Sequence, residues 1–130
     1  MNHKRELTDL YVISGVTGMT GSELARQLVC SGNRVVGFDN FFASSIASVR
    51  DIAAHPLFTF HEYDLNCQEQ MAQLADEIRS LKHDDTRVIY INCAAVVHTE
   101  HFYHVNRTFA TNVQGMKSFL EQAIAIGAEI

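Results

Sequence analysis

The chain has 130 residues with 47% apolar and 19% charged side chains, a balance that predicts one folded domain rather than a disordered segment. The formal net charge is −5 and the 10 Lys and Arg residues are scattered, which argues against nucleic acid as a partner. The sequence shows no signal peptide and no run near the roughly 20 apolar residues of a membrane span, and its three cysteines are typical of reduced thiols, so we expect a cytoplasmic protein.

Apolar runs that indicate strands alternate with helical patterns along the chain. Strands are predicted over residues 10–14, 34–38, 57–63 and 87–92. Helices are predicted over residues 20–30, from an Asn66 and Glu69 capping pair to Leu81, and over residues 104–126, with a loop and a helical turn over 41–55. The alternation predicts the α/β class and a partial Rossmann fold, a doubly wound parallel sheet in the strand order 3-2-1-4.

The last predicted helix carries six apolar residues at helical spacing. They are Val105, Phe109, Val113, Met116, Leu120 and Ile124. A stripe of this kind usually packs on the core, so the sequence predicts that these side chains face inward.

A glycine turn joins the first predicted strand to the first predicted helix. Gly15 permits the tight turn, Gly18 leaves room for a pyrophosphate, and Gly21 lets the helix pack closely on the sheet. The N–H groups at the start of the helix favour phosphate oxygens. The turn therefore predicts a dinucleotide site, and the alternative is a glycine-rich turn without a ligand. The residues between these glycines that join the predicted site are Thr17, Met19 and Thr20.

Asp39 ends the second predicted strand 18 residues after Gly21, where a carboxylate can accept both hydroxyls of an adenosine ribose. A 2′-phosphate would be repelled by this charge, and residues 40–43 contain no arginine to receive one. The sequence therefore favours NAD over NADP. The alternative role for Asp39 is that of a turn residue at the end of a strand.

Four further landmarks follow the glycine turn and Ser22 in order. They are Asp39-Asn40, Asp64-Leu65, Asn92-Cys93-Ala94-Ala95 and Asn112-Val113-Gln114-Gly115. This series resembles the N-terminal cofactor-binding half of the extended short-chain dehydrogenase/reductases, the NAD-dependent sugar-nucleotide epimerase/dehydratase family. One departure is Asn92, where many members of that family carry histidine.

The resemblance implies a role for several of these residues. It places Asp64 and Leu65 beside the adenine and Ala94 and Ala95 under the cofactor. Asn40 and Asn112 join the cofactor-binding set through the same motifs.

The resemblance also implies chemistry by a Tyr-x-x-x-Lys pair that lies beyond a fifth strand. None of the four tyrosines is followed by lysine four residues later, and the nearest mimic is Tyr103 with Arg107. We therefore expect residues 1–130 to form a single NAD-binding domain that stops before the fifth strand, lacks a substrate domain and is inactive alone.

Three histidines, His98, His101 and His104, recur every three residues with Glu100 among them. A metal site and a solvated or substrate-facing loop are both open, and the loop is favoured because nothing in the sequence shows supporting residues.

Two functions remain open. In the first, the chain is the cofactor half of an epimerase, dehydratase or reductase whose nucleotide-sugar substrate binds only in a full-length parent. In the second, it is a non-catalytic nucleotide-binding module that acts through a protein interface. In either case we expect a homodimer through the exposed edge of strand 87–92 or through helices.

Overall fold

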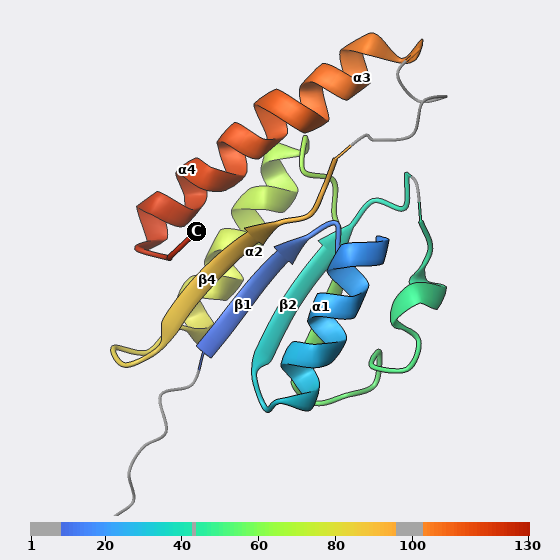
Figure 1. Ribbon diagram of the computed structural model, residues 1–130. Helices are drawn as coiled ribbons and strands as arrows, with labels where there is room; N and C mark the ends of the chain where they lie inside the picture. The colour runs from blue at the N-terminus through green and yellow to red at the C-terminus, as the bar shows by residue number, and fades with distance from the viewer. Residues whose placement is uncertain (1–8, 43, 96–102) are drawn as a thin grey trace, which may run out of the picture.

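The computed structural model describes residues 9–42, 44–95 and 103–130. Its centre is a sheet of four parallel strands in the order β3-β2-β1-β4 (Figure 1). The strands are β1 (Asp9–Ser14), β2 (Arg34–Asp39), β3 (Phe58–Glu62) and β4 (Arg87–Asn92). The predicted class, strand order and parallel sense are confirmed.

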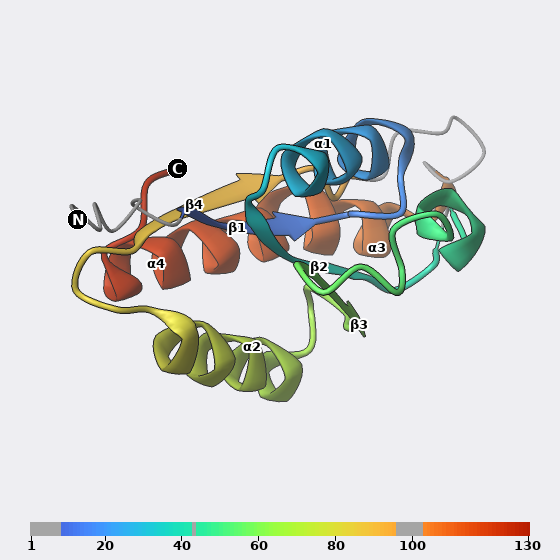
Figure 2. The same cartoon turned by 90° about the horizontal axis from the view of Figure 1, so that it is seen from below.

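Helices cover both faces of the sheet, as Figure 2 shows from below. On one face lies α1 (Met19–Cys30), with the short 3-10 helix η1 (Ile46–Val49) beside it. The other face carries α2 (Gln68–Leu81) and a long helix made of α3 (Val105–Phe109), the π-helical segment η3 (Ala110–Gly115) and α4 (Met116–Ile126). Within the described ranges, no helix is both long and apolar enough to cross a bilayer.

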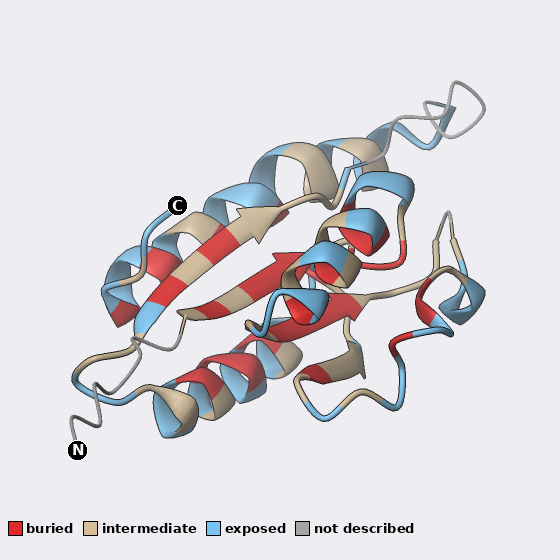
Figure 3. Ribbon diagram, turned by 60° about the horizontal axis from the view of Figure 1, so that its bottom comes forward, coloured by how far each residue is buried: buried red, intermediate tan, exposed pale blue. Residues whose placement is uncertain are grey.

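Each strand contributes to two cores because successive side chains point to opposite faces. Ile13 and Val35 pack under α1, whereas Val12 and Val36 pack under α2 and α4. All four side chains are fully buried, and Figure 3 shows burial running along the inner strands and the sheet-facing sides of the helices. Burial on both faces explains why these strands are almost continuously apolar in sequence.

The long C-terminal helix turns a different face to the sheet from the one predicted. Its buried residues are Gly115, Phe119, Ala123 and Ile126. Five of the six residues predicted to face inward are exposed, namely Val105, Phe109, Val113, Met116 and Ile124, and Leu120 is only half-buried. The prediction was wrong because the helix is apolar on two sides. Phe119 fits between Phe38 and Tyr90, with ring centroids 5.9 and 4.8 Å away, while small residues beside it allow close approach.

The predicted capping pair at the start of α2 is also wrong. Cys67 is the N-cap, and no side chain in the described chain caps the helix there. The Asn66 side chain instead donates to Thr111 Oγ1 at 3.2 Å, and its backbone N–H donates to Asp64 Oδ1 at 2.8 Å. The Asp64 carboxylate thus organises this turn in place of the helix cap.

The edge of β4 is less exposed than expected. The Tyr90 N–H donates to the Glu129 carbonyl, and the Glu129 N–H donates to the Val88 carbonyl, both at 2.8 Å. Glu129 therefore pairs with Ile89 as a parallel bridge and covers the middle of this edge. The same segment follows Gly127, which ends α4 in the left-handed conformation.

Candidate functional site

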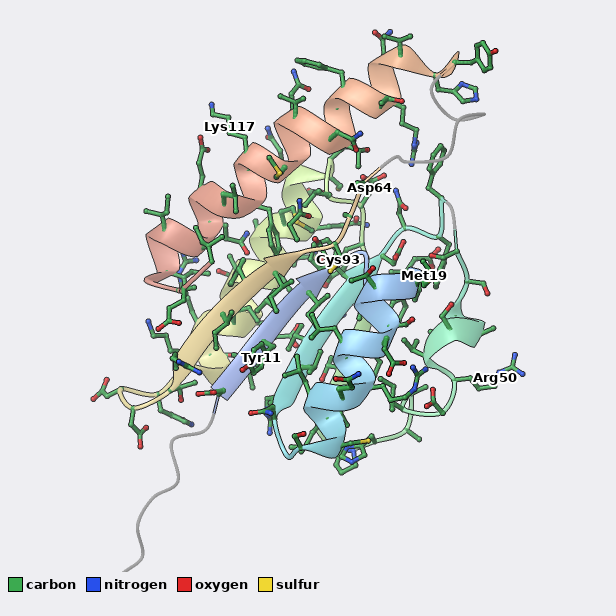
Figure 4. The ribbon with its side chains drawn as sticks, viewed as in Figure 1. Tyr11, Met19, Arg50, Asp64, Cys93 and Lys117 are labelled. Atoms are coloured by element: carbon green, nitrogen blue, oxygen red, sulfur yellow. The ribbon has the colours of Figure 1, made fainter. Side chains whose placement is uncertain are left out.

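A cavity of about 1150 Å³ opens where the parallel strands end. Its walls come from the glycine turn, the loop after β2, the residues after β3 and β4, and the start of the long C-terminal helix. Figure 4 shows Met19, Asp64 and Cys93 together at this end of the sheet, with Tyr11 at the opposite end. This is the edge at which open α/β sheets bind ligands, next to the point where the strand order reverses.

Backbone crowding accounts for two of the three glycines. Gly15 has φ of +66°, and a Cβ there would lie 2.7 Å from Ala94 N and Cys93 C. A Cβ on Gly21 would lie 2.3 Å from the Gly15 carbonyl oxygen. Only glycine fits at either position, as the sequence predicted.

Gly18 has a different role, because a Cβ there would lie 3.3 Å from its nearest neighbour, Gly15 O, and would otherwise point into open space. Gly18 is the N-cap of α1, and no side chain among the described residues caps the helix. The first N–H groups of α1 thus have no intrahelical partner, and the helix dipole adds partial positive charge at this point. The arrangement suits an anion such as a pyrophosphate.

Asp39 joins the glycine turn to the loop after β2. Its Oδ2 accepts the Thr17 N–H at 3.2 Å and its Oδ1 accepts the Phe41 N–H at 3.0 Å. The Thr17 hydroxyl in turn lies 2.6 Å from the Ser44 hydroxyl. An ionised carboxylate offers about four lone-pair sites. Asp39 can therefore hold the turn and still accept hydroxyl groups of a ligand.

Asp64 lies at the far end of the cavity, after β3. Its Oδ2 accepts a hydrogen bond from Asn40 Nδ2 at 3.2 Å and lies 3.8 Å from Arg107 Nη2. Leu65 is buried beneath it, and a Cβ on Gly115 would come within 2.9 Å of the Leu65 side chain. The glycine of the Asn-Val-x-Gly motif thus lets the C-terminal helix pack closely against Leu65 in the cavity wall.

Ser14 secures the floor of the site where β1 and β4 meet. Its buried hydroxyl donates to Asn92 Oδ1 and accepts the N–H groups of Cys93 and Ala94, at 3.1 and 3.3 Å. One donor and two acceptor positions are therefore all in use. Asn92, the departure from the family pattern, supplies the acceptor that orients this hydroxyl. Burial raises the pKa of the Cys93 thiol above its ordinary value and so disfavours the thiolate.

The cavity brings together twelve of the thirteen residues predicted for the site. They are Gly15, Thr17, Gly18, Met19, Thr20, Gly21, Asp39, Asn40, Asp64, Leu65, Ala94 and Ala95. Asn112 is the exception, because it lies one position beyond the lining residue Thr111 and does not itself line the cavity.

The histidine segment and the tyrosine mimic lie outside this arrangement. Tyr103 is 87% exposed and His104 is exposed, whereas His98, Glu100 and His101 fall outside the described residues. In the part of the chain that the structure describes, no group of three or more potential metal ligands occurs.

Sequence reasoning missed several residues that line the cavity. They are Phe38, Phe41, Phe42, Ser44, Ser45, Ser48, Tyr63, Cys93, Arg107 and Thr111. The loop serines follow Asp39 closely and gave a weak signal. Arg107 was considered only as a partner for Tyr103, and no local pattern indicates that it meets Asp64.

Comparisons with known proteins agree with this geometry. A family model described as GDP-mannose 4,6 dehydratase matches residues 12–129. The UDP-glucuronic acid decarboxylase 1 of Arabidopsis thaliana is 25% identical over 118 residues, which are 90% of this chain and 24% of that protein.

Two solved structures share the fold. Pal from Bacillus thuringiensis matches with a TM-score of 0.78 at 18% identity, over 92% of this chain and 36% of its own. The UDP-glucose 4-epimerase of Thermus thermophilus, solved in complex with NAD, matches with a TM-score of 0.74 at 20% identity, over 92% of this chain and 35% of its own. The chain thus spans about a quarter of that curated relative and about a third of either solved chain.

Proposed function

The chain belongs to the GDP-mannose 4,6 dehydratase family, and on that premise we propose that it holds the ADP portion of NAD at the edge where its parallel strands end. The resemblance to sugar-nucleotide epimerases and dehydratases, drawn from the glycine turn and the landmarks after it, is confirmed by this membership. The glycine turn and α1 would hold the pyrophosphate, Asp39 the ribose, and Asp64 with Leu65 the adenine. Ala94 and Ala95 would lie under the cofactor, and Asn112 would support the wall from η3.

The observation that carries the proposal is the hydrogen bond of 3.2 Å from the Thr17 N–H to Asp39 Oδ2. It fixes a carboxylate beside an uncapped helix N-terminus, so that a ribose acceptor and a phosphate site share one cavity. A 2′-phosphate would meet the Asp39 charge, which favours NAD over NADP. The complex of the Thermus thermophilus epimerase with NAD supports the same choice.

Calorimetry with NAD and with ADP tests the proposal. We expect weak binding to the wild-type chain, abolished by Gly18→Val, whose side chain fills the space for the pyrophosphate. Asp39→Ala should weaken binding sharply, while Asp84→Ala, which removes an exposed carboxylate from a distant turn, should leave it unchanged. Equal affinity in the Asp39→Ala and wild-type proteins would contradict the proposal that Asp39 binds the ribose.

We further propose that residues 1–130 act as the NAD-binding domain of a nucleotide-sugar enzyme in the cytoplasm. NAD, when bound, would accept a hydride from a sugar carbon and return it. The matched relatives with an activity in their names are enzymes, so the alternative of a regulatory module gains no support. In this proposal the chain's own residues bind and orient the cofactor, and the nucleotide sugar is the partner of the whole protein.

We also propose that two copies associate through the exposed apolar stripe of the long C-terminal helix. The stripe consists of Val105, Phe109, Val113, Met116 and Ile124. Lys117 and Glu121 lie beside it and form an ion pair, 3.3 Å apart, so these two side chains add no net charge that would repel a second copy. The β4 edge is less suitable, since Glu129 already covers its middle.

Sedimentation at several concentrations checks this association. The wild-type chain should dimerise, and Val113→Glu should give a monomer because it buries a charge in the stripe. Ser118→Glu adds the same charge at an exposed position off the stripe and should dimerise normally. A wild-type chain that stays monomeric at high concentration would contradict the proposal.

A further inference from the structure

Arg107 occupies an unusual position at the Asp64 end of the cavity. Its guanidinium carbon lies 4.1 Å from the centroid of the Phe42 ring, and its Nη2 lies 3.8 Å from Asp64 Oδ2. Its Nε–H is buried and has no hydrogen-bond partner among the described residues. A buried donor without a partner is costly unless a ligand supplies the acceptor.

The loop after β2 is shaped to bring Phe42 to this arginine. The Asp39 and Asn40 side chains accept the N–H groups of Phe41 and Phe42, each at 3.0 Å. These two turns hold Phe41 at φ of 60°, a left-handed conformation that is rare for an aromatic residue. The Phe41 ring then stacks on Phe60, with centroids 5.5 Å apart, and the Phe42 ring meets the guanidinium.

The long C-terminal helix presents Arg107 to the cavity. Arg107 and Thr111 are four residues apart and both line the cavity, so they share one face of the helix. The π-helical segment Ala110–Gly115 begins between them, and such segments often occur at functional sites. The outward stripe of apolar residues lies on another face of the same helix.

We propose that Arg107 positions the base of the bound nucleotide by stacking its guanidinium plane, supported by Phe42, on a purine ring beside Asp64. The inference rests on the proposed function and names a residue that makes the nucleotide site specific for one kind of base. A phosphate at this place is disfavoured, because the Asp64 carboxylate is close and the phosphate site lies at the start of α1. A flat neutral ring gains cation–π and stacking contacts with the face of the guanidinium.

The experiment compares ADP with UDP, which share the ribose and the diphosphate and differ in the base. Calorimetry on the full chain should show that the wild type prefers ADP. Arg107→Ala should weaken ADP binding about tenfold and leave UDP binding within about twofold, because only the stacking on the larger ring is lost. Arg107→Lys keeps the charge without the plane and should weaken ADP binding in the same way.

Controls separate a role in binding from a role in folding. Arg50→Ala removes an exposed arginine that points away from the cavity and should leave both affinities unchanged (Figure 4). Thermal unfolding shows whether each variant folds, and if Arg107→Ala does not, Arg107→Lys carries the test.

The possible results are distinguishable. Equal losses for ADP and UDP would overturn the proposal, since Arg107 would then act on the diphosphate through its charge. An unchanged ADP affinity in Arg107→Ala would overturn the role of Arg107 and leave the proposed function standing. A wild-type chain that binds neither nucleotide would contradict the proposed function itself.

Discussion

The unit from β1 to β2 and the long C-terminal helix differ in how well their structure can be predicted from their sequence. In the first unit the constraint on Gly21 is local, because a Cβ there would meet the carbonyl oxygen of Gly15, only six residues earlier. In the C-terminal helix two apolar faces compete for the sheet, and the face with fewer large residues lies inward. Local crowding can be predicted from a motif, whereas the choice between two faces depends on what lies opposite.

The two faces of the C-terminal helix also differ in what their residues contribute. Phe119 fills a space between Phe38 and Tyr90 that belongs to the core under α2 and α4. Phe109 belongs to the stripe that this chain leaves exposed. Phe119 should therefore stabilise the monomer, whereas Phe109 should not.

The largest expected effect comes from Phe119→Ala, which opens a cavity in the core. We expect the free energy of unfolding to fall by about 3–5 kcal/mol. Phe109→Ala, the matched change on the outward stripe, should alter it by no more than about 0.5 kcal/mol. Urea denaturation at low protein concentration, where self-association is minimal, measures both. Similar losses for the two variants would mean that both faces are buried in the monomer.

The next effect tests the glycine turn. Gly21→Ala places a Cβ 2.3 Å from the Gly15 carbonyl oxygen, and the backbone must move to relieve this contact. We expect a loss of about 3 kcal/mol in the free energy of unfolding. Gly32→Ala is the matched control, because φ is +86° there but no atom lies within 4 Å of the new Cβ. Its loss should be only about 1 kcal/mol, the strain of the left-handed conformation. A Gly21→Ala protein as stable as Gly32→Ala would show that the close contact is not required.

The same contrast explains which parts of the site were predictable. Glycines, a strand-end carboxylate and small residues after β4 have roles that depend on the strand–turn–helix context, and the sequence displays that context directly. Arg107 was not predictable as a cavity residue, since its neighbours Phe42 and Asp64 are 65 and 43 residues away and no periodicity links them. The π-helical segment was equally hidden, because it changes the helical register without a signal in composition. The predicted capping pair at Asn66 failed for a related reason, because the Asn66 side chain donates to Thr111, 45 residues away, instead of capping α2.

The smallest expected effect concerns a polar link on the inner face of α4. The Tyr90 hydroxyl donates to Gln122 Oε1 at 2.7 Å, and Gln122 Nε2 donates to the Met71 carbonyl at 2.8 Å, so one glutamine ties β4 to α2. Tyr90→Phe leaves the Gln122 oxygen without this donor and should lower the free energy of unfolding by about 1 kcal/mol.

The pH dependence of the stability difference between wild type and Tyr90→Phe tests whether the buried hydroxyl causes this difference. Burial raises the pKa of Tyr90 above its ordinary value of 10.0, because ionisation would place a charge in the core. The unfolded chain then loses this proton at lower pH than the folded chain, so the stability that Tyr90 contributes falls as the pH rises above about 10. Denaturation from pH 8 to 11 should therefore show a constant advantage of wild type over Tyr90→Phe up to about pH 10 and a shrinking one beyond it. If the stability difference stayed constant to pH 11, the Tyr90 hydroxyl would have to be exposed to water, and α4 would not be packed on the core at this position.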